Sequence, residues 1–187
     1  QQWLRAAPAV RTQVLFHAWQ EHPVWDELAY IPELLVERPW AADTSVPRAK
    51  ALRHLAGCPE GKWLALGAWT QVIEASDPEF LRPSGAGSRL RVRRRETGTP
   101  LEGVTSWNDV EGRYLRALVQ GPLHWLGAVE MGESPNHGLA FRLTALGQAL
   151  LHPGAGLPLL AEEPIMVEGT FDIWVPPEAS PYAVYAL

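Results

Sequence analysis

The order of predicted elements in the middle of the chain limits its fold more than any other feature. Apolar spacing and turn residues predict a helix, a short strand or connection, a second helix and a β-hairpin, over residues 47–57, 62–66, 66–77 and 89–105. Glu96-Thr97-Gly98 forms the expected hairpin turn, because glycine adopts positive φ easily, and residues 101–105 form the return strand. Helix, helix and hairpin in this order are typical of a winged-helix module.

A similar order returns over residues 106–153. Ser106 to Asp109 resembles a capping box, and apolar spacing predicts a helix that Gly121-Pro122 ends. A loop then leads into a strand over 139–143, the second hairpin, and Thr144 caps a short helix. We therefore expect an α+β fold with tandem winged-helix-like modules.

Four segments follow from this pattern. Residues 1–46 form an N-terminal helical extension, with a helix over 8–21 and a short helix and turn over 23–37. The two modules take residues 47–105 and 106–153. Residues 154–187 form a linker and the start of a further β-containing domain, in which 165–175 alternates as a strand pair and a helix starts at Pro176. Because that helix is cut short and no Met precedes Gln1-Gln2-Trp3, we expect a piece of a longer protein.

Composition excludes several classes of protein. The 187 residues carry a net charge of -5, which excludes a histone-like basic coat, and the one cysteine excludes a disulfide framework. No apolar run reaches the roughly 18–20 residues of a membrane span, and no signal peptide is visible, so we expect a cytoplasmic protein without membrane contact. Residues 1–120 hold 15 Lys/Arg and 14 Asp/Glu, whereas residues 121–187 hold one and seven. Basic charge is therefore concentrated in the first part.

Two stretches resemble bacterial proteins. The first is Gly121-Pro122-Leu123-His124-Trp125-Leu126-Gly127-Ala128-Val129 followed by Ala140-Phe141-Arg142-Leu143-Thr144-Ala145-Leu146-Gly147, and the second is Ile165-Met166-Val167-Glu168-Gly169-Thr170-Phe171-Asp172-Ile173-Trp174-Val175-Pro176-Pro177-Glu178-Ala179. They resemble a winged-helix region associated with domains related to the N-terminal region of XPB-type helicases, although Ala145 stands where Pro is usual and Glu168 where Gln is common. The resemblance implies winged-helix architecture and a DNA-associated setting, and it supplies no catalytic residue.

A cluster of arginines is the candidate nucleic-acid site. It comprises Arg82, Arg89, Arg91, Arg93, Arg94 and Arg95. On a strand, the odd-numbered members share one face, and Leu90, Val92 and Arg94 share the other. Four guanidinium–phosphate contacts predict a salt slope of about -3 to -4. The alternative is a solvated or acid-paired edge strand, whose charge prevents aggregation.

The helices that would read DNA bases argue against DNA contact. Residues 67–75 contain no Lys or Arg, residues 122–128 are nearly all apolar, and the loop 133–137 is acidic. We therefore expect the second module to pack on a neighbour. Trp19, Trp69 and Trp125 lie on apolar faces and are expected in the core; Trp3, Trp25 and Trp40 lie in less regular segments, where an exposed ring stacks bases or anchors a protein interface.

The sequence contains no recognisable catalytic residue, cofactor site or metal site. His54 and Cys58 stand four residues apart on a predicted helix, but two ligands make a weak metal site. The leading hypothesis is a non-enzymatic DNA-binding module of a larger bacterial helicase-associated protein, which holds the DNA backbone, duplex or single-stranded, through the arginines. The alternative is a scaffold that packs against proteins, including other domains of its parent. A third reading is a fragment of an enzyme whose catalytic part lies elsewhere.

Overall fold

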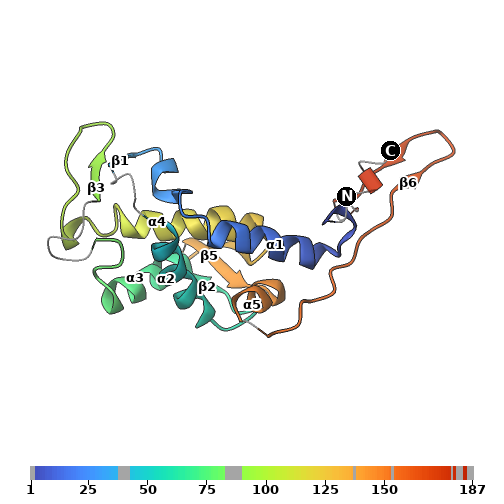
Figure 1. The fold of residues 1–187 in the computed structure, drawn as a ribbon, viewed down its shortest axis with the longest axis horizontal. Helices are drawn as coiled ribbons and strands as arrows, with labels where there is room; N and C mark the ends of the chain where they lie inside the picture. The colour runs from blue at the N-terminus through green and yellow to red at the C-terminus, as the bar shows by residue number, and fades with distance from the viewer. Residues whose placement is uncertain are drawn as a thin grey trace.

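The computed structural model describes residues 3–37, 43–82, 90–136, 138–152, 154–177, 179 and 183–184. It has an α+β fold, as the sequence predicts, with a body of helices and small sheets and an extended C-terminal arm (Figure 1). The helical elements are η1 Trp3–Arg5, α1 Pro8–Gln20, η2 Glu27–Tyr30, α2 Ser45–Ala56, α3 Leu66–Ser76, η3 Val104–Ser106, α4 Glu111–Leu118, η4 Val119–Leu123 and α5 Ala145–Leu151. The strands are β1 Leu34–Glu37, β2 Leu64–Ala65, β3 Arg91–Arg94, β4 Val129–Ser134, β5 Gly138–Leu143, β6 Met166–Val167 and β7 Ile173–Trp174.

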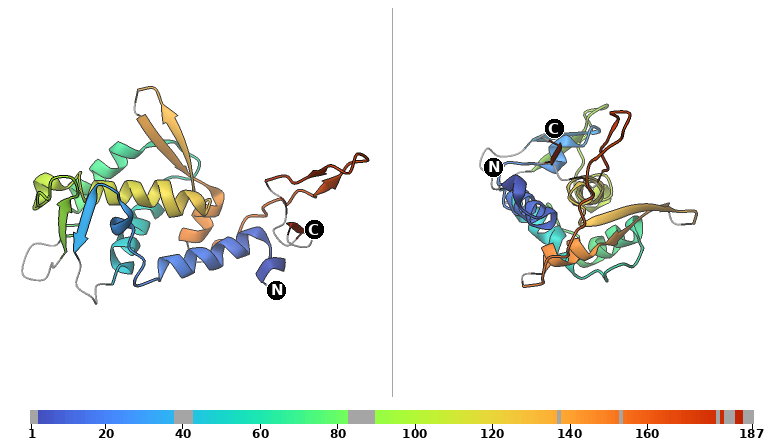
Figure 2. Two further views of the ribbon diagram at one scale, coloured as in Figure 1. Left: turned by 90° about the horizontal axis from the view of Figure 1, so that it is seen from above. Right: turned by 90° about the vertical axis from the view of Figure 1, so that its right-hand side faces the viewer.

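A three-stranded antiparallel sheet in the order β2-β5-β4 joins the two predicted modules. Leu64 of β2 pairs with Phe141 of β5, and Val129 of β4 pairs with Leu143. Strand β2 comes from the expected first module, whereas the β4–β5 hairpin comes from the expected second one. The two segments therefore share one sheet. The β4–β5 hairpin projects from the body of the protein (Figure 2).

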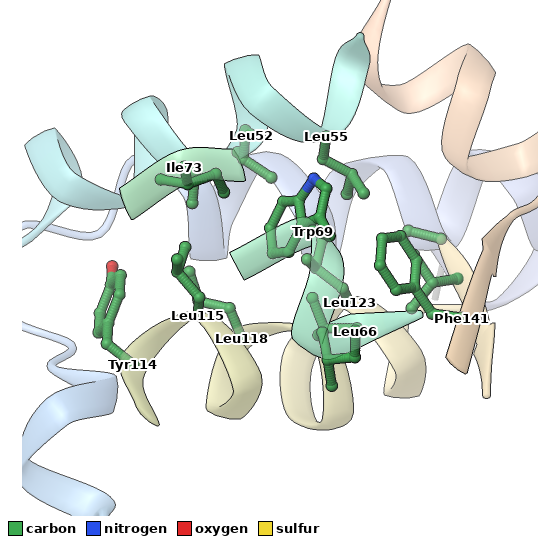
Figure 3. Packing of buried hydrophobic residues seen from close by; sticks show 14 of the residues in the cluster. Leu52, Leu55, Leu66, Trp69, Ile73, Tyr114, Leu115, Leu118, Leu123 and Phe141 are labelled. Carbon is green, nitrogen blue, oxygen red and sulfur yellow. The ribbon is translucent and has the colours of Figure 1, made fainter. Parts of the chain in front are cut away.

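The core lies among α2, α3, α4 and β5 (Figure 3). Trp69 of α3 packs edge-on against Phe141 of β5, with ring centroids 5.4 Å apart. Leu55 of α2 and Leu115 of α4 are fully buried in the same cluster. One continuous cluster of buried residues in the described part of the chain therefore includes side chains from both predicted modules.

The arginine ribbon, by which we mean β1 and β3 together, differs from the predicted hairpin. The turn is confirmed, since Gly98 has φ 68° and its N–H donates to Arg94 O at 2.8 Å. The return strand predicted over 101–105 is wrong in extent: the returning chain pairs with β3 around Arg93 and Pro100, where Arg94 N–H donates to Thr99 O and Leu101 N–H donates to Val92 O, and η3 follows. The main partner of β3 is β1, which lies in the segment predicted as a short helix and turn.

The helix that contains α4 is interrupted at Gly121-Pro122, as the sequence predicts. The chain continues from α4 into η4, and a kink lies inside η4 at Gly121, whose φ of -99° and ψ of -111° are not helical. A second, short helical stretch follows through His124 and Trp125. A proline in a helix interior removes a donor and clashes with the preceding turn, and the kink accommodates both effects.

The C-terminal arm leaves α5 and ends in the β6–β7 hairpin, as the alternation over 165–175 predicts. An ion pair of 2.8 Å between Arg11 Nη2 and Glu162 Oε1 ties the arm to α1. Most of the helix expected from Pro176 lies outside the described residues. Among the helices of the described residues, none is both long and apolar enough to span a bilayer.

Candidate functional site

Arg82 belongs to the interior and not to an exposed cluster. Its side chain is 12% exposed, and its Nη2 donates to Glu111 Oε2 at 2.6 Å. Further donors go to Glu111 Oε1, to the Leu101 carbonyl and to Ser106 Oγ. Because these partners use its donors within the chain, Arg82 does not count among the candidate phosphate contacts.

The other arginines divide between two faces of the arginine ribbon. Val92 is buried and Arg94 on the same face pairs with Asp109 at 2.9 Å, which confirms the predicted alternation along β3. Arg91 is exposed and has no partner among the described residues. The guanidinium of Arg95 donates to the carbonyls of residues 32 and 34. Arg89 lies outside the described residues.

One acidic residue of β1, Glu37, reduces the net charge of the outward face. The register places Glu37 opposite Arg91 and Leu35 opposite Arg93, so these side chains share one face. Arg93 Nε lies 3.8 Å from Glu37 Oε1, a long and solvent-exposed pair. The outward arginines of the ribbon are therefore partly neutralised by Glu37 of the neighbouring strand.

The β4–β5 hairpin is also poor in available positive charge. Arg142 donates from Nε to Glu130 Oε2 at 2.7 Å, and its guanidinium lies 5.0 Å from the centre of the Trp63 ring. Glu133 adds a further negative charge on β4. In the described part of this hairpin, the one arginine is thus already paired.

A groove of about 840 Å³ runs along α4, and we call it the α4 groove. One wall is η2 with its flanking residues, and the other is α4 with η4. Its lining is Trp25, Glu27, Tyr30, Ile31, Pro32, Asn108, Asp109, Arg113, Arg116, Ala117, Gln120, Gly121, Pro122 and Trp125. Apolar and aromatic walls with a few polar groups are the usual features of binding sites.

Exposed aromatic rings stand along the α4 groove. Trp125 is 75% exposed, Tyr30 is 68% exposed, and the rings of Trp25 and Tyr30 lie 5.3 Å apart. The prediction that Trp125 belongs to the core is wrong: the ring is exposed and lies next to Gly121. Trp69 is buried as predicted, and Trp19 packs at the edge of the core.

Two arginines of α4 face the groove in different electrostatic settings. Arg113 lies 3.3 Å from Glu33 and 3.8 Å from Asp109, so acidic groups already surround it. Arg116 is half-buried and has no acidic partner among the described residues. The groove could not be predicted from the sequence, because 80 residues separate the end of η2 from the start of α4. Its one signal in the sequence was the alternative that the Trp25 ring is exposed.

The groove wall that η2 provides is held by Arg48. This fully buried side chain donates from Nε to Glu27 Oε1 at 3.0 Å and from Nη2 to the Trp25 carbonyl at 2.7 Å. Trp19 Nε1 donates to the same carboxylate at 2.7 Å. The lining residue Glu27 is therefore part of a rigid support and does not face a ligand as an open charge.

Side chains that could bind a metal ion do not gather in the described part of the chain. No group of three or more His, Cys, Asp or Glu in this part of the chain is arranged to hold a metal ion. Cys58 donates weakly to the His54 carbonyl, at 3.6 Å, so the sulfur and the His54 ring are not a ligand pair. Burial raises the pKa of the Cys58 thiol, which opposes nucleophilic reactivity. In comparisons with family models, curated proteins and solved structures, nothing matches this chain.

Proposed function

We propose that this chain is a non-enzymatic protein-interaction module built on a winged-helix arrangement. The order α2, β2, α3, α4, β4, β5 and the sheet order β2-β5-β4 support a single module of this kind, with residues 77–110 inserted between its second and third helices. In that arrangement α4 is the recognition helix and the β4–β5 hairpin is the wing. The setting we propose, on the resemblance of residues 121–147 and 165–179, is a larger bacterial helicase-associated protein.

One observation carries the proposal: η2 packs along the helix that would have to read DNA. The major groove of B-DNA, about 12 Å wide, admits one α-helix. A helix with a second segment beside it is too wide to enter, whereas the same pair of walls suits a polypeptide partner. Exposed tryptophan and tyrosine side chains are typical anchors of such interfaces.

Photocrosslinking from the α4 groove tests this function. A photoreactive residue is placed at position 125 of the parent protein in cells. It should crosslink to one defined protein, and that protein, once purified, should bind the chain. The matched control is position 72 on α3, where Val72 is 65% exposed and does not line the groove. Adducts with nucleic acid, or polypeptide adducts equally frequent from position 72, would overturn the proposal.

DNA-backbone binding is the second candidate, and the outward face of the arginine ribbon favours it. Arg91 and Arg93 project from one side of β3, and two phosphate contacts predict a salt slope of about -2. Replacement of the two by alanine should flatten the slope of duplex or single-strand binding, whereas Arg53→Ala on α2 should leave it unchanged. An unchanged slope in the double variant, or no binding at low salt, excludes this candidate.

A further inference from the structure

We propose that the α4 groove binds an amphipathic segment of a partner protein in which a carboxylate stands beside apolar anchor residues. This inference rests on the proposed function and names the chemistry of the partner. Three features of the groove support it: its aromatic walls, its single cation without an acidic partner, and its rigid frame.

The aromatic walls set the apolar part of the partner. Trp25 and Tyr30 on one wall and Trp125 on the other leave large ring areas open to solvent. Burial of apolar surface contributes about 25 cal/mol per Å², so covering such rings with aliphatic or aromatic side chains is the main source of affinity. A helix or extended segment with two or three apolar residues on one side matches a groove with two walls.

Arg116 sets the charge of the partner. Its guanidinium lies beside Gly112, where a Cβ would be 3.5 Å from Nη1, an ordinary van der Waals distance. Glu33 and Asp109 already neutralise Arg113, and Arg48 neutralises Glu27. Of the charged groups described in the lining, Arg116 is the one left without a partner. A carboxylate accepts two parallel hydrogen bonds from a guanidinium, which adds both affinity and orientation.

The same charges disfavour a nucleic acid as the occupant. Binding of a single strand needs a track of several unneutralised cations beside the stacking rings. The α4 groove has the rings, but Asp109 faces one end and only Arg116 is left to meet a phosphate. A peptide with one well-placed carboxylate needs no such track.

The frame of the groove suits a surface that is formed before the partner arrives. Arg48 fixes η2 through hydrogen bonds to Glu27 and to the Trp25 carbonyl, and Trp125, in the helical stretch after the kink at Gly121, lines the opposite wall. A preformed groove loses little conformational entropy on binding, which favours recognition of a short segment.

Defined peptides test the inference. The probe is a labelled 14-residue amphipathic peptide with leucine and tryptophan anchors and glutamates on the adjoining side. Two comparison peptides carry glutamine or lysine in place of each glutamate. Fluorescence polarisation with the full chain should rank glutamate above glutamine above lysine. Arg116→Gln should weaken the glutamate peptide roughly tenfold, the effect of losing one charged hydrogen bond, and Arg116→Glu should reverse the preference toward lysine.

Control variants separate the possible outcomes. Arg53→Gln, an exposed arginine of α2, should leave all three affinities unchanged, and circular dichroism should show that each variant is folded. Equal binding of the three peptides overturns the proposed carboxylate recognition but leaves the proposed protein-interaction function unaffected. A crosslinked partner segment that lacks a carboxylate beside its anchors has the same two consequences. An oligo-dT that binds instead and is lost in Trp125→Ala overturns both.

Discussion

Arg48 donates from Nε to Oε1 of Glu27 at 3.0 Å, with both side chains buried, and this pair fixes η2 against the body of the protein. Its Nη1 donates to the carbonyls of Trp19, Gln20 and His22, and its Nη2 donates to the Trp25 carbonyl and to Glu27 Oε2. Buried charges need such complete partnering, because an ion without partners in the interior is strongly unfavourable. The wall of the α4 groove and the packing of α2 thus depend on one guanidinium.

Removal of either partner of this pair should destabilise the fold. Arg48→Met leaves the Glu27 carboxylate buried and without its cation, and should lower the free energy of unfolding by about 3–5 kcal/mol. Urea denaturation monitored by circular dichroism measures the change. The control is Lys50→Met, since Lys50 pairs with Asp77 at a half-exposed site and should lose at most about 1 kcal/mol. Equal effects of the two substitutions would contradict the structural role given to Arg48.

The arginines of the predicted cluster should differ sharply in their effect on stability. Arg82→Ala leaves Glu111, which is 1% exposed, without its partner and should cost about 3–5 kcal/mol. Arg91→Ala should stay within about 0.5 kcal/mol of the parent, because the side chain is exposed. Thermal and urea unfolding measure both. A destabilised Arg91→Ala would show that this side chain has a structural partner.

The local elements could be predicted from the sequence, and their long-range pairings could not. Apolar spacing located α1, α2 and α3 to within a residue or two, and Thr144 caps α5 as expected, with its Oγ1 accepting from Gly147 N–H at 2.9 Å. Local hydrogen bonds and amphipathic spacing determine such features. The pairing of β1 with β3, and of β2 with β5, joins segments far apart in the chain, about which periodicity carries no information.

At the candidate site, too, local features could be predicted from the sequence and long-range contacts could not. Alternation along β3 correctly separated Val92 from the outward arginines, but it could not show that Glu37 lies across from Arg91. Arg82 looked like part of the cluster because it is near in sequence; its partner Glu111 is 29 residues away. Trp125 looked buried because it lies in the nearly all-apolar stretch 122–128, but its ring is exposed.

Gly147 is required by a close approach and not by an unusual backbone. A Cβ at this position would lie 2.0 Å from the Ala128 carbonyl oxygen and 2.8 Å from Leu143 Cδ1. Gly147→Ala should therefore lower the free energy of unfolding by about 3 kcal/mol, at the upper end of overpacking effects. Gly67→Ala on α3 has nothing within 4 Å of the new Cβ and should stabilise by about 0.5–1 kcal/mol. Urea denaturation of both variants measures whether the free energy of unfolding falls in Gly147→Ala and rises in Gly67→Ala.

Ala145 is the first residue of α5, a position that proline tolerates in helices. The preceding Thr144 has φ -84° and ψ 165°, the extended conformation that a following proline prefers. Ala145→Pro should thus leave stability unchanged or raise it by about 0.4–1 kcal/mol through the unfolded state. Ala149→Pro, in the interior of the same helix and buried, should be destabilising by about 3 kcal/mol or more. Loss of stability in Ala145→Pro comparable to that of Ala149→Pro would contradict the placement of the helix start.

Cys58 should react slowly with thiol reagents. Burial raises the pKa of its thiol above the ordinary value of 9.0, because the half-buried sulfur favours the neutral form. The thiolate is the reactive species, so at pH 8 to 9 the folded chain should react with an aromatic disulfide more slowly than the urea-unfolded chain does. The contribution of this group to folding is present below the unfolded pKa and is lost as the pH rises through the folded pKa. Reaction rates measured from pH 7 to 10 should thus show an inflection at higher pH in the folded state, and an inflection shared by the two states would contradict the burial of the thiol.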